Sequence, residues 1–334
     1  MKLADRIGLF EKLGKYILDN SDEWKYIKER AFAANGWFLP EFIDLATENI
    51  AVRFLGKEAL EGWTAQYPHL QPDNVTPKTV GVVMAGNIPL VGFHDLLSVL
   101  ISGHRIRIKP SSKDEILIRH LTEKLVEWSP EMGDYIAFAE LLKNCDAYIA
   151  TGASATANYF EYYFGKYPHI IRKNRSSAAI VSGSESQEEL QLLARDIFDF
   201  FGMGCRNITK LYVPTGYNFL PLLDALKQFD YLADHHKYKN NYDYNLALHI
   251  LNNKNYMSTA ALLLVENKDL FSPVSQLHYE FYTDEAAVVE ELKSNENLQC
   301  IVGKNLIPFG EAQSPALNDY ADGVDTLRWL LQLN

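Results

Sequence analysis

From Thr79 onward, short strand-like runs alternate with amphipathic helical runs, and no other feature limits the possible folds as strongly. Strands that alternate with helices are joined by right-handed crossovers and form a mainly parallel sheet. Such sheets bind ligands at the carboxyl ends of their strands. The first expected series comprises strands at Thr79–Ala85, Arg105–Lys109, Ala147–Ala150 and Ala178–Val181, with helices from about Leu90, from Lys113 to Trp128 and from Ala153.

A second series follows a helix expected over about Glu188 to Phe201. It comprises strands at Asn207–Val213, Ala260–Val265, Ser275–Tyr282 and Leu298–Val302, with helices from about Phe219 and from Asp284. The pattern before Thr79 is helical, and a final helix is expected near Val324–Leu333. We therefore predict an α/β protein with two parallel-sheet domains, divided into a helical N-terminal region (1–78), a first α/β domain (79–195), a second (196–307) and a C-terminal segment (308–334).

Net charge, apolar stretches and cysteine spacing limit the kinds of partner and the cellular compartment that this chain suits. The formal net charge of −11 argues against a nucleic-acid partner and a polybasic membrane anchor, which leaves small molecules. The N-terminus carries charges throughout, and no stretch approaches the roughly 18 apolar residues of a membrane span, so neither export nor insertion is indicated. The three cysteines, Cys145, Cys205 and Cys300, are too widely spaced for a disulfide framework or a CxxC site, which favours a reducing cytoplasm.

Cys205 is the candidate nucleophile. It stands in Gly202-Met203-Gly204-Cys205-Arg206, between a predicted helix and a predicted strand. Glycines permit tight backbone conformations that leave a thiol reachable, and Arg206 would favour the thiolate, which is the reactive form. An inert buried cysteine in a Gly-containing turn fits this segment slightly better when the segment is taken alone. Cys145 and Cys300 lack such a setting and are expected in the core.

Three strand ends carry further candidates. Asn87 follows the first strand, where its amide and nearby helix N–H groups would face an anion or a developing oxyanion; an ordinary N-cap is the alternative. Lys109 ends the second strand and would hold a ribose or phosphate, unless it is simply solvated. Thr151 and Gly152 end the third strand and suit an anion site or a plain N-cap.

The order of these segments resembles the aldehyde dehydrogenase superfamily. In that family strands end in WNFP-type, KPS and TGS segments, a later Gly-rich segment presents the catalytic Cys, and an EIFGPV element follows. The matching segments here are Gly86-Asn87-Ile88-Pro89, Lys109-Pro110-Ser111, Thr151-Gly152-Ala153-Ser154, Gly204-Cys205 and Asp269-Leu270-Phe271-Ser272-Pro273-Val274. The resemblance implies that the first α/β domain is a Rossmann-like cofactor domain and the second is catalytic.

Within the superfamily, the closest resemblance is to the fatty acyl-CoA reductases of bacterial bioluminescence. It is carried by Ala85-Gly86-Asn87-Ile88-Pro89, Gly204-Cys205-Arg206-Asn207 and the tail Pro308-Phe309-Gly310-Glu311-Ala312-Gln313. The resemblance implies reduction of an acyl-CoA to an aldehyde through an acyl group bound to Cys205, with Asn87 and the Cys205 N–H as oxyanion donors.

The resemblance also assigns cofactor roles. Lys109 and Ser112 would contact the adenosine ribose, and Thr151 and Gly152 would lie near the pyrophosphate. Asp269 would position the nicotinamide ribose and Phe271 the nicotinamide ring. No residue is assigned to a metal.

Three departures from the family pattern refine the prediction. Arg172 falls where hydrolytic members carry a Glu that activates water, and a guanidinium cannot take that proton, so exchange to a thiol such as CoA is favoured. Ser112 and then Lys113 replace the Glu that often holds the ribose in NAD-preferring members, which favours NADPH over NADH. The chain is also short and lacks evident oligomerisation strands, which leaves open a homo-oligomer or a partner enzyme that supplies acyl groups.

Three other functions remain open from the sequence. A CoA-acylating aldehyde dehydrogenase would use the same residues in the opposite direction. A hydrolytic aldehyde dehydrogenase would need a base elsewhere. A non-catalytic nucleotide-binding protein of the same fold would have a Cys205 no more reactive than Cys145. The aromatic residues of 159–164 suit an apolar tunnel or, more simply, helix packing.

Overall fold

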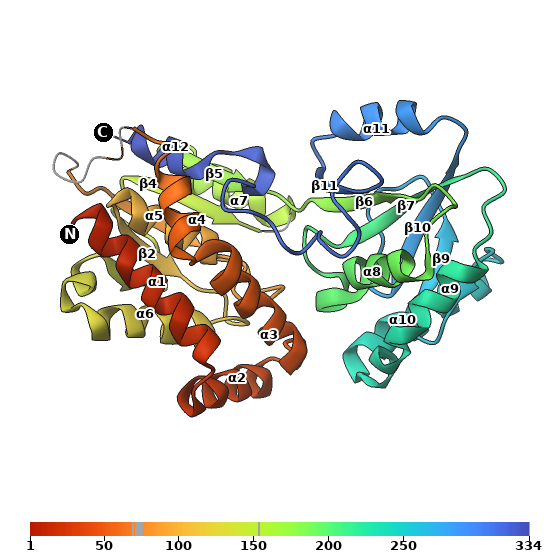
Figure 1. Cartoon of the computed structure of the whole chain (residues 1–334), viewed down its shortest axis with the longest axis horizontal. Coiled ribbons are helices and arrows are strands. Elements are labelled where there is room, and N and C mark those ends of the chain that lie inside the picture. Colours follow the sequence, from red (N-terminus) through yellow and green to blue (C-terminus); the bar gives the residue numbers. More distant parts are fainter. Residues whose placement is uncertain (69, 71–75, 153, 334) are drawn as a thin grey trace. The chain divides into compact units, whose positions relative to one another are not determined.

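The structure is a computed structural model and describes residues 1–68, 70, 76–152 and 154–333 (Figure 1). The chain divides into two compact units, each built around its own sheet. The first unit comprises Met1–Asn174 and Pro315–Asn334, and the second comprises Arg175–Ser314. None of the described helices combines the length and the apolarity that crossing a membrane requires.

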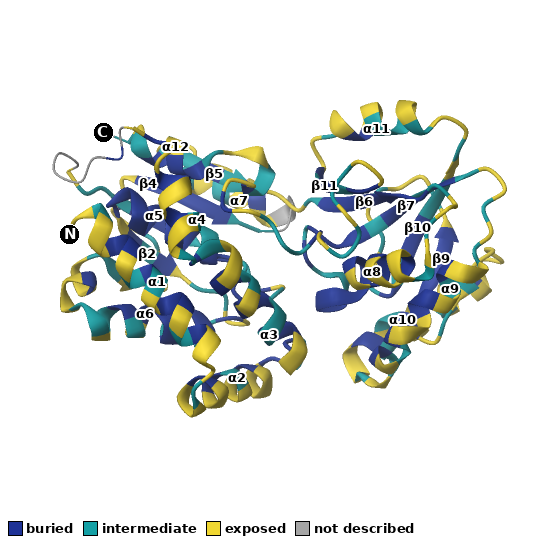
Figure 2. Ribbon diagram, viewed as in Figure 1, coloured by how far each residue is buried: buried dark blue, intermediate teal, exposed yellow. Residues whose placement is uncertain are grey.

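Helices open the first unit, as the sequence predicts. They are α1 (Leu3–Asp19), α2 (Asp22–Ala34), α3 (Pro40–Asn49), a π-helical turn (Ile50–Phe54) and α4 (Lys57–Thr64). The Ser21 hydroxyl accepts a hydrogen bond from the Trp24 N–H and caps α2, while Pro40 opens α3 without losing an intrahelical bond. Ile7, Phe10 and Leu13 form a buried stripe on α1. Figure 2 shows dark blue, buried segments on this helix.

A five-stranded parallel sheet forms the centre of the first unit, in the order β3-β2-β1-β4-β5. Its elements are β1 (Thr79–Val83), α5 (Phe93–Ser102), β2 (Arg105–Lys109), α6 (Ile116–Trp128), a 3-10 turn (Pro130–Asp134), β3 (Ile136–Phe138), β4 (Ala147–Thr151), α7 (Ser154–Phe164) and β5 (His169–Arg172). Gly103, with φ of 87°, ends α5 in the left-handed conformation that glycine adopts most easily. One hydrophobic core joins the N-terminal helices to this sheet.

The second unit contains a six-stranded sheet in the order β11-β6-β7-β10-β9-β8, parallel except for the β8–β9 pair. Its elements are β6 (Ser176–Ile180), α8 (Gln187–Phe198), a 3-10 turn (Asp199–Gly202), β7 (Ile208–Pro214), α9 (Leu220–Leu226), a 3-10 segment (Lys227–Asp234), α10 (His236–Leu251), β8 (Met257–Ser258), β9 (Leu263–Glu266), β10 (Gln276–Tyr282), α11 (Glu285–Lys293) and β11 (Leu298–Gly303).

The division between the units differs from the predicted boundary at residues 195 and 196. The strand predicted at Ala178–Val181 is β6, and it pairs with β7 and β11 of the second sheet. Periodicity shows that this segment is a buried strand but does not show which sheet it joins.

The predicted C-terminal segment is also divided. Residues up to Ser314 belong to the second unit, whereas a 3-10 turn (Ala321–Gly323) and α12 (Thr326–Leu331) pack on the first, where the Leu330 carbonyl hydrogen-bonds to His104 Nε2 at 2.9 Å.

Candidate active site

Cys205 lies in the short loop between the Asp199–Gly202 turn and β7, and its side chain is half-buried. Three residues shortly before it have a left-handed backbone conformation: Phe200 and Phe201, with φ of 55° and 56°, and Gly202, with φ of 73°. Left-handed backbone is unfavourable for residues other than glycine and persists where the surroundings fix it. The ring of Phe201 is fully buried and lies 5.3 Å from the ring of Tyr238.

Asn207 holds the backbone on both sides of Cys205. Its Oδ1 accepts a hydrogen bond from the Gly204 N–H at 2.7 Å. Its Nδ2 donates to the Asp196 carbonyl at 3.1 Å and the Asp199 carbonyl at 2.7 Å. The Asn207 side chain is fully buried, so these bonds connect the end of α8, the turn and the Cys205 loop away from competing water.

Two further side chains fix this loop. Ser177 Oγ donates to the Cys205 carbonyl at 3.1 Å. Arg206, predicted to favour the Cys205 thiolate, is buried and donates from Nη1 to the Ala312 carbonyl at 3.2 Å, so one contact of its guanidinium anchors the C-terminal tail.

Asp196 ties the same tail to α8. Its carboxylate accepts hydrogen bonds from the Gly310 N–H at 2.7 Å and the Ala312 N–H at 3.1 Å. Burial raises the pKa of Asp196 to about 7 and that of Asp199 to about 6. The segment 310–312 thus lies against the helix that leads into the Cys205 loop.

The other two cysteines are buried, as predicted. Burial raises the pKa of Cys145, and it raises the pKa of Cys300 to about 11. A thiol reacts as its thiolate, so both are poor nucleophiles at neutral pH. Among the three cysteines, all of which the structure describes, only Cys205 is not buried.

The Asp269–Val274 loop lies beside the start of β7. The Leu270 carbonyl accepts a hydrogen bond from Thr209 Oγ1 at 2.8 Å, and a small cavity is lined by Gly202, Thr209 and Pro273. Asp269 and Phe271 are both exposed. The structure therefore brings the loop that carries these two predicted residues close to the Cys205 loop, within the second unit.

Asn87, Lys109 and Thr151 gather at the carboxyl edge of the first sheet. Val83 of β1 pairs with Lys109 of β2 on one side, and with the residue before Thr151 of β4 on the other. Asn87 follows β1 closely and is exposed, as are Lys109 and Ser112, whereas Thr151 and Gly152 are half-buried. These residues all belong to the first unit and surround the end of β1.

Gly86 permits a close approach at this edge. A Cβ at this position would lie 2.5 Å from Ser111 Oγ, so a larger residue would push the two strand ends apart. The Leu90 N–H donates to Asp114 Oδ2 at 2.6 Å and joins the same two segments.

Because α5 begins at Phe93 after Gly92, Asn87 is not the cap of this helix. Helix α7 begins at Ser154; Ala153, in the predicted TGS-type segment, lies outside the described residues.

Arg172 ends β5 and is buried in the first unit. Its Nη1 lies 2.6 Å from Asp95 Oδ1, and its Nη2 donates to Thr326 Oγ1 at 2.7 Å. A guanidinium held in this way cannot serve as a general base.

The sequence did not predict the residues that hold the Cys205 loop, above all Asn207, Asp196 and Ser177. The sequence gives no clear signal for Asn207, because the strand that follows it also contains the polar residues Thr209 and Lys210.

No protein-family model matches the sequence, and no curated protein is similar to it in sequence. Solved structures are similar in fold. An NADP-dependent enzyme from E. coli has a TM-score of 0.67 at 12% identity, over 90% of this chain and 73% of the other. An aldehyde dehydrogenase from Bacillus cereus with NAD+ has a TM-score of 0.64 at 14% identity, over 90% and 72%. One from Mycobacterium tuberculosis with NAD+ has a TM-score of 0.60 at 15% identity, over 87% and 70%.

These similarities confirm the predicted fold. The chain has the aldehyde dehydrogenase architecture, with two α/β units that contain mainly parallel sheets.

Proposed function

We propose that the chain is an NADPH-dependent acyl-CoA reductase that forms an aldehyde through an acyl group bound to Cys205. The observation that carries the proposal is the setting of Cys205: a half-buried thiol on a loop fixed by buried hydrogen bonds, while the other cysteines are buried. An aldehyde-related oxidoreductase using a nicotinamide cofactor also suits the fold, since similar structures include an NADP-dependent enzyme and NAD+ complexes.

In the proposed reaction the Cys205 thiolate attacks the thioester carbonyl carbon, and the carbon–sulfur bond to CoA breaks as CoA leaves. The oxyanion that forms accepts hydrogen bonds from the Cys205 N–H and from the Asn87 amide, the second donor that the resemblance implies. NADPH, when bound, supplies the hydride that reduces the acyl carbon. Breakage of the bond to Cys205 then releases the aldehyde and restores the thiolate.

The first unit fits a nicotinamide dinucleotide. The ends of β1, β2 and β4 lie side by side, as ligand sites in parallel sheets require. Because Gly86 has no Cβ, the segment after β1 lies directly against Ser111 in the segment after β2. Lys109, Ser112, Thr151 and Gly152 would hold the adenosine ribose and pyrophosphate. The resemblance assigns the nicotinamide ribose to Asp269 and the nicotinamide ring to Phe271. The hydroxyl of Ser112 tolerates a 2′-phosphate, which a carboxylate would repel.

Arg172 distinguishes reduction from hydrolysis. It occupies the place in the sequence pattern of the Glu that activates water, and in the structure it is committed to Asp95 and Thr326. Without that base an acyl group on Cys205 is long-lived towards water and remains available for hydride or for CoA.

The proposal is tested by incubating the purified chain with NADPH and acyl-CoA substrates of increasing chain length. NADPH absorbance and free CoA are followed together, with Cys205→Ser and Cys145→Ser compared. Equal amounts of oxidised cofactor and released CoA, lost in Cys205→Ser and kept in Cys145→Ser, support the reductase. CoA release without oxidation indicates a hydrolase or acyltransferase, and no reaction with any substrate favours a binding protein.

A further inference from the structure

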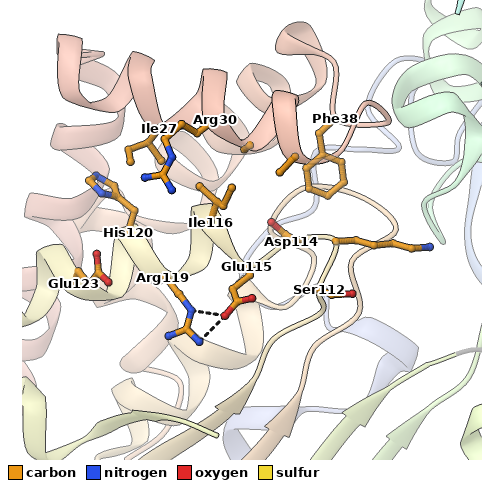
Figure 3. Close-up of a pocket in the computed structure, with 13 residues that line it drawn as sticks. Ile27, Arg30, Phe38, Ser112, Asp114, Glu115, Ile116, Arg119, His120 and Glu123 are labelled. Atoms are coloured by element: carbon orange, nitrogen blue, oxygen red, sulfur yellow. Dashed lines mark hydrogen bonds and ion pairs between the residues drawn. The ribbon is translucent and has the colours of Figure 1, made fainter. Parts of the chain in front are cut away.

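A cavity of about 410 Å³ opens in the first unit between α2 and the N-terminal part of α6 (Figure 3). This volume lies within the range of about 300–1,000 Å³ that is typical of small-molecule sites. Ser112 and Lys113 line one end of the cavity, directly after the second strand end of the candidate site. Asn35 Nδ2 donates to the Lys113 carbonyl at 3.2 Å and joins the end of α2 to this segment.

One wall of the cavity is apolar. Ile27 and Ala31 of α2 line it together with Phe38, and all three are buried. Ile116, the first residue of α6, also lines the cavity (Figure 3). An apolar slot of this kind suits a flat ring such as a purine base.

One carboxyl oxygen of Asp114 has no hydrogen-bond partner. It is 7% exposed, and while its Oδ2 accepts the Leu90 N–H, its Oδ1 is buried without a hydrogen-bond partner. Figure 3 shows the carboxyl group of Asp114 among the side chains that line the cavity. A buried acceptor without a donor is unfavourable, and an amino group or hydroxyl of a ligand would satisfy it.

Two cations remain available at the cavity. Arg119 is engaged, since its Nε and Nη2 both lie 2.5 Å from Glu115 Oε1. Arg30 and Lys113 are exposed, and neither forms an ion pair with a carboxylate in the described part of the chain. A further carboxylate, Glu123, lines the cavity at the end near His120. An anionic group near Arg30 or Lys113 would therefore meet a cation that forms no ion pair within the described part of the chain.

We propose that this cavity binds a phosphorylated adenosine, with the base against the apolar wall, Asp114 accepting from an amino group or hydroxyl, and Arg30 and Lys113 facing a ribose phosphate. The inference rests on the proposed function, because that function uses two ligands with such a group. NADPH carries a 2′-phosphate on its adenosine, and CoA carries a 3′-phosphate.

The test measures binding of 2′,5′-ADP, 3′,5′-ADP and 5′-AMP to the full chain by titration calorimetry at millimolar ligand concentration. We expect one bisphosphate to bind at least about ten-fold more tightly than 5′-AMP, because a phosphate paired with a cation adds this much. Tighter binding of 2′,5′-ADP assigns the cavity to the NADPH end, and tighter binding of 3′,5′-ADP assigns it to the CoA end.

Two variants of α2 complete the test. Arg30→Gln should weaken the preferred bisphosphate about ten-fold, whereas Lys25→Gln removes the same charge from an exposed site outside the cavity and should change nothing. Equal binding of 5′-AMP and both bisphosphates, no binding of any of them, or equal effects of the two variants would overturn the proposal.

The experiment separates this inference from the proposed function. Cys205→Ser removes the nucleophile, and Cys205 lies outside the cavity, so nucleotide binding should be as in wild type. Binding that persists in a chain without reductase activity would retain the cavity and reject the reaction. If Arg30→Gln kept reductase activity with unchanged KM values for NADPH and acyl-CoA, the proposed reaction would be retained and the role of the cavity rejected.

Discussion

Removal of the Asn207 side chain should loosen the Cys205 loop more than any other single change to its surroundings. In Asn207→Ala the Gly204 N–H loses its acceptor, and the Asp196 and Asp199 carbonyls lose their donor. All three bonds are part of a fully buried network, so water cannot readily replace the missing amide.

The magnitude follows from these three bonds. A buried backbone group left without a partner costs about 1–3 kcal/mol, and partial relaxation of the loop recovers some of this. We therefore expect Asn207→Ala to lower the free energy of unfolding of the second unit by about 3 kcal/mol. The left-handed backbone at Phe200 and Phe201 should relax as well, because the amide that holds the turn is gone.

Urea unfolding and the rate at which a thiol reagent modifies Cys205 measure the two effects. Asn218→Ala is the matched control, because Asn218 is exposed and accepts one bond from the Leu220 N–H at 3.2 Å. It should change stability by less than about 1 kcal/mol and leave thiol reactivity unchanged. If the two variants unfolded at the same urea concentration and modified Cys205 equally fast, the assigned role of Asn207 would be wrong.

Two further predictions concern buried charges. Arg172→Met leaves Asp95 buried without its cation and should lower the free energy of unfolding of the first unit by about 3–5 kcal/mol, measured by urea unfolding. A decrease of less than about 1 kcal/mol would contradict a stabilising role of the Arg172–Asp95 ion pair. Burial raises the pKa of Asp114 to about 7, above its unfolded value of about 3.9, so its stabilising contribution is complete below pH 4 and is lost as pH rises through 7. Asp114→Asn keeps an acceptor for Leu90 and should exceed wild type in stability by up to about 4 kcal/mol at pH 8, but not at pH 4; equal stability at both values would contradict this.

Much of the fold could be predicted because local pattern and tertiary structure agree along most of the chain. Ser21 and Pro40 mark helix starts, and the apolar runs at Thr79–Val83 and Ala147–Thr151 form central strands. Assigning a strand to a sheet is different, because β6 pairs with strands that lie far from it in sequence. Apolar periodicity carries no information about such partners.

The part of the candidate site at the strand ends of the first sheet could be predicted, because its sequence motifs depend on local backbone geometry. Gly86, Lys109 and Thr151 mark strand ends, and the structure places their segments together at one sheet edge. The supports of Cys205 were not predictable, because the bonds of Asn207 and Asp196 depend on how α8, the turn and the tail pack. The cavity beside Ser112 was missed for the same reason, since its walls come from α2 and α6.

The most direct test of the central claim is intact-protein mass spectrometry of the chain mixed with an acyl-CoA in the absence of NADPH. Our account predicts one added acyl mass, located on Cys205 by peptide mapping, absent in Cys205→Ser and discharged when NADPH is added. An unmodified protein, or an acyl group on Cys145 or Cys300, would contradict Cys205 as the nucleophile.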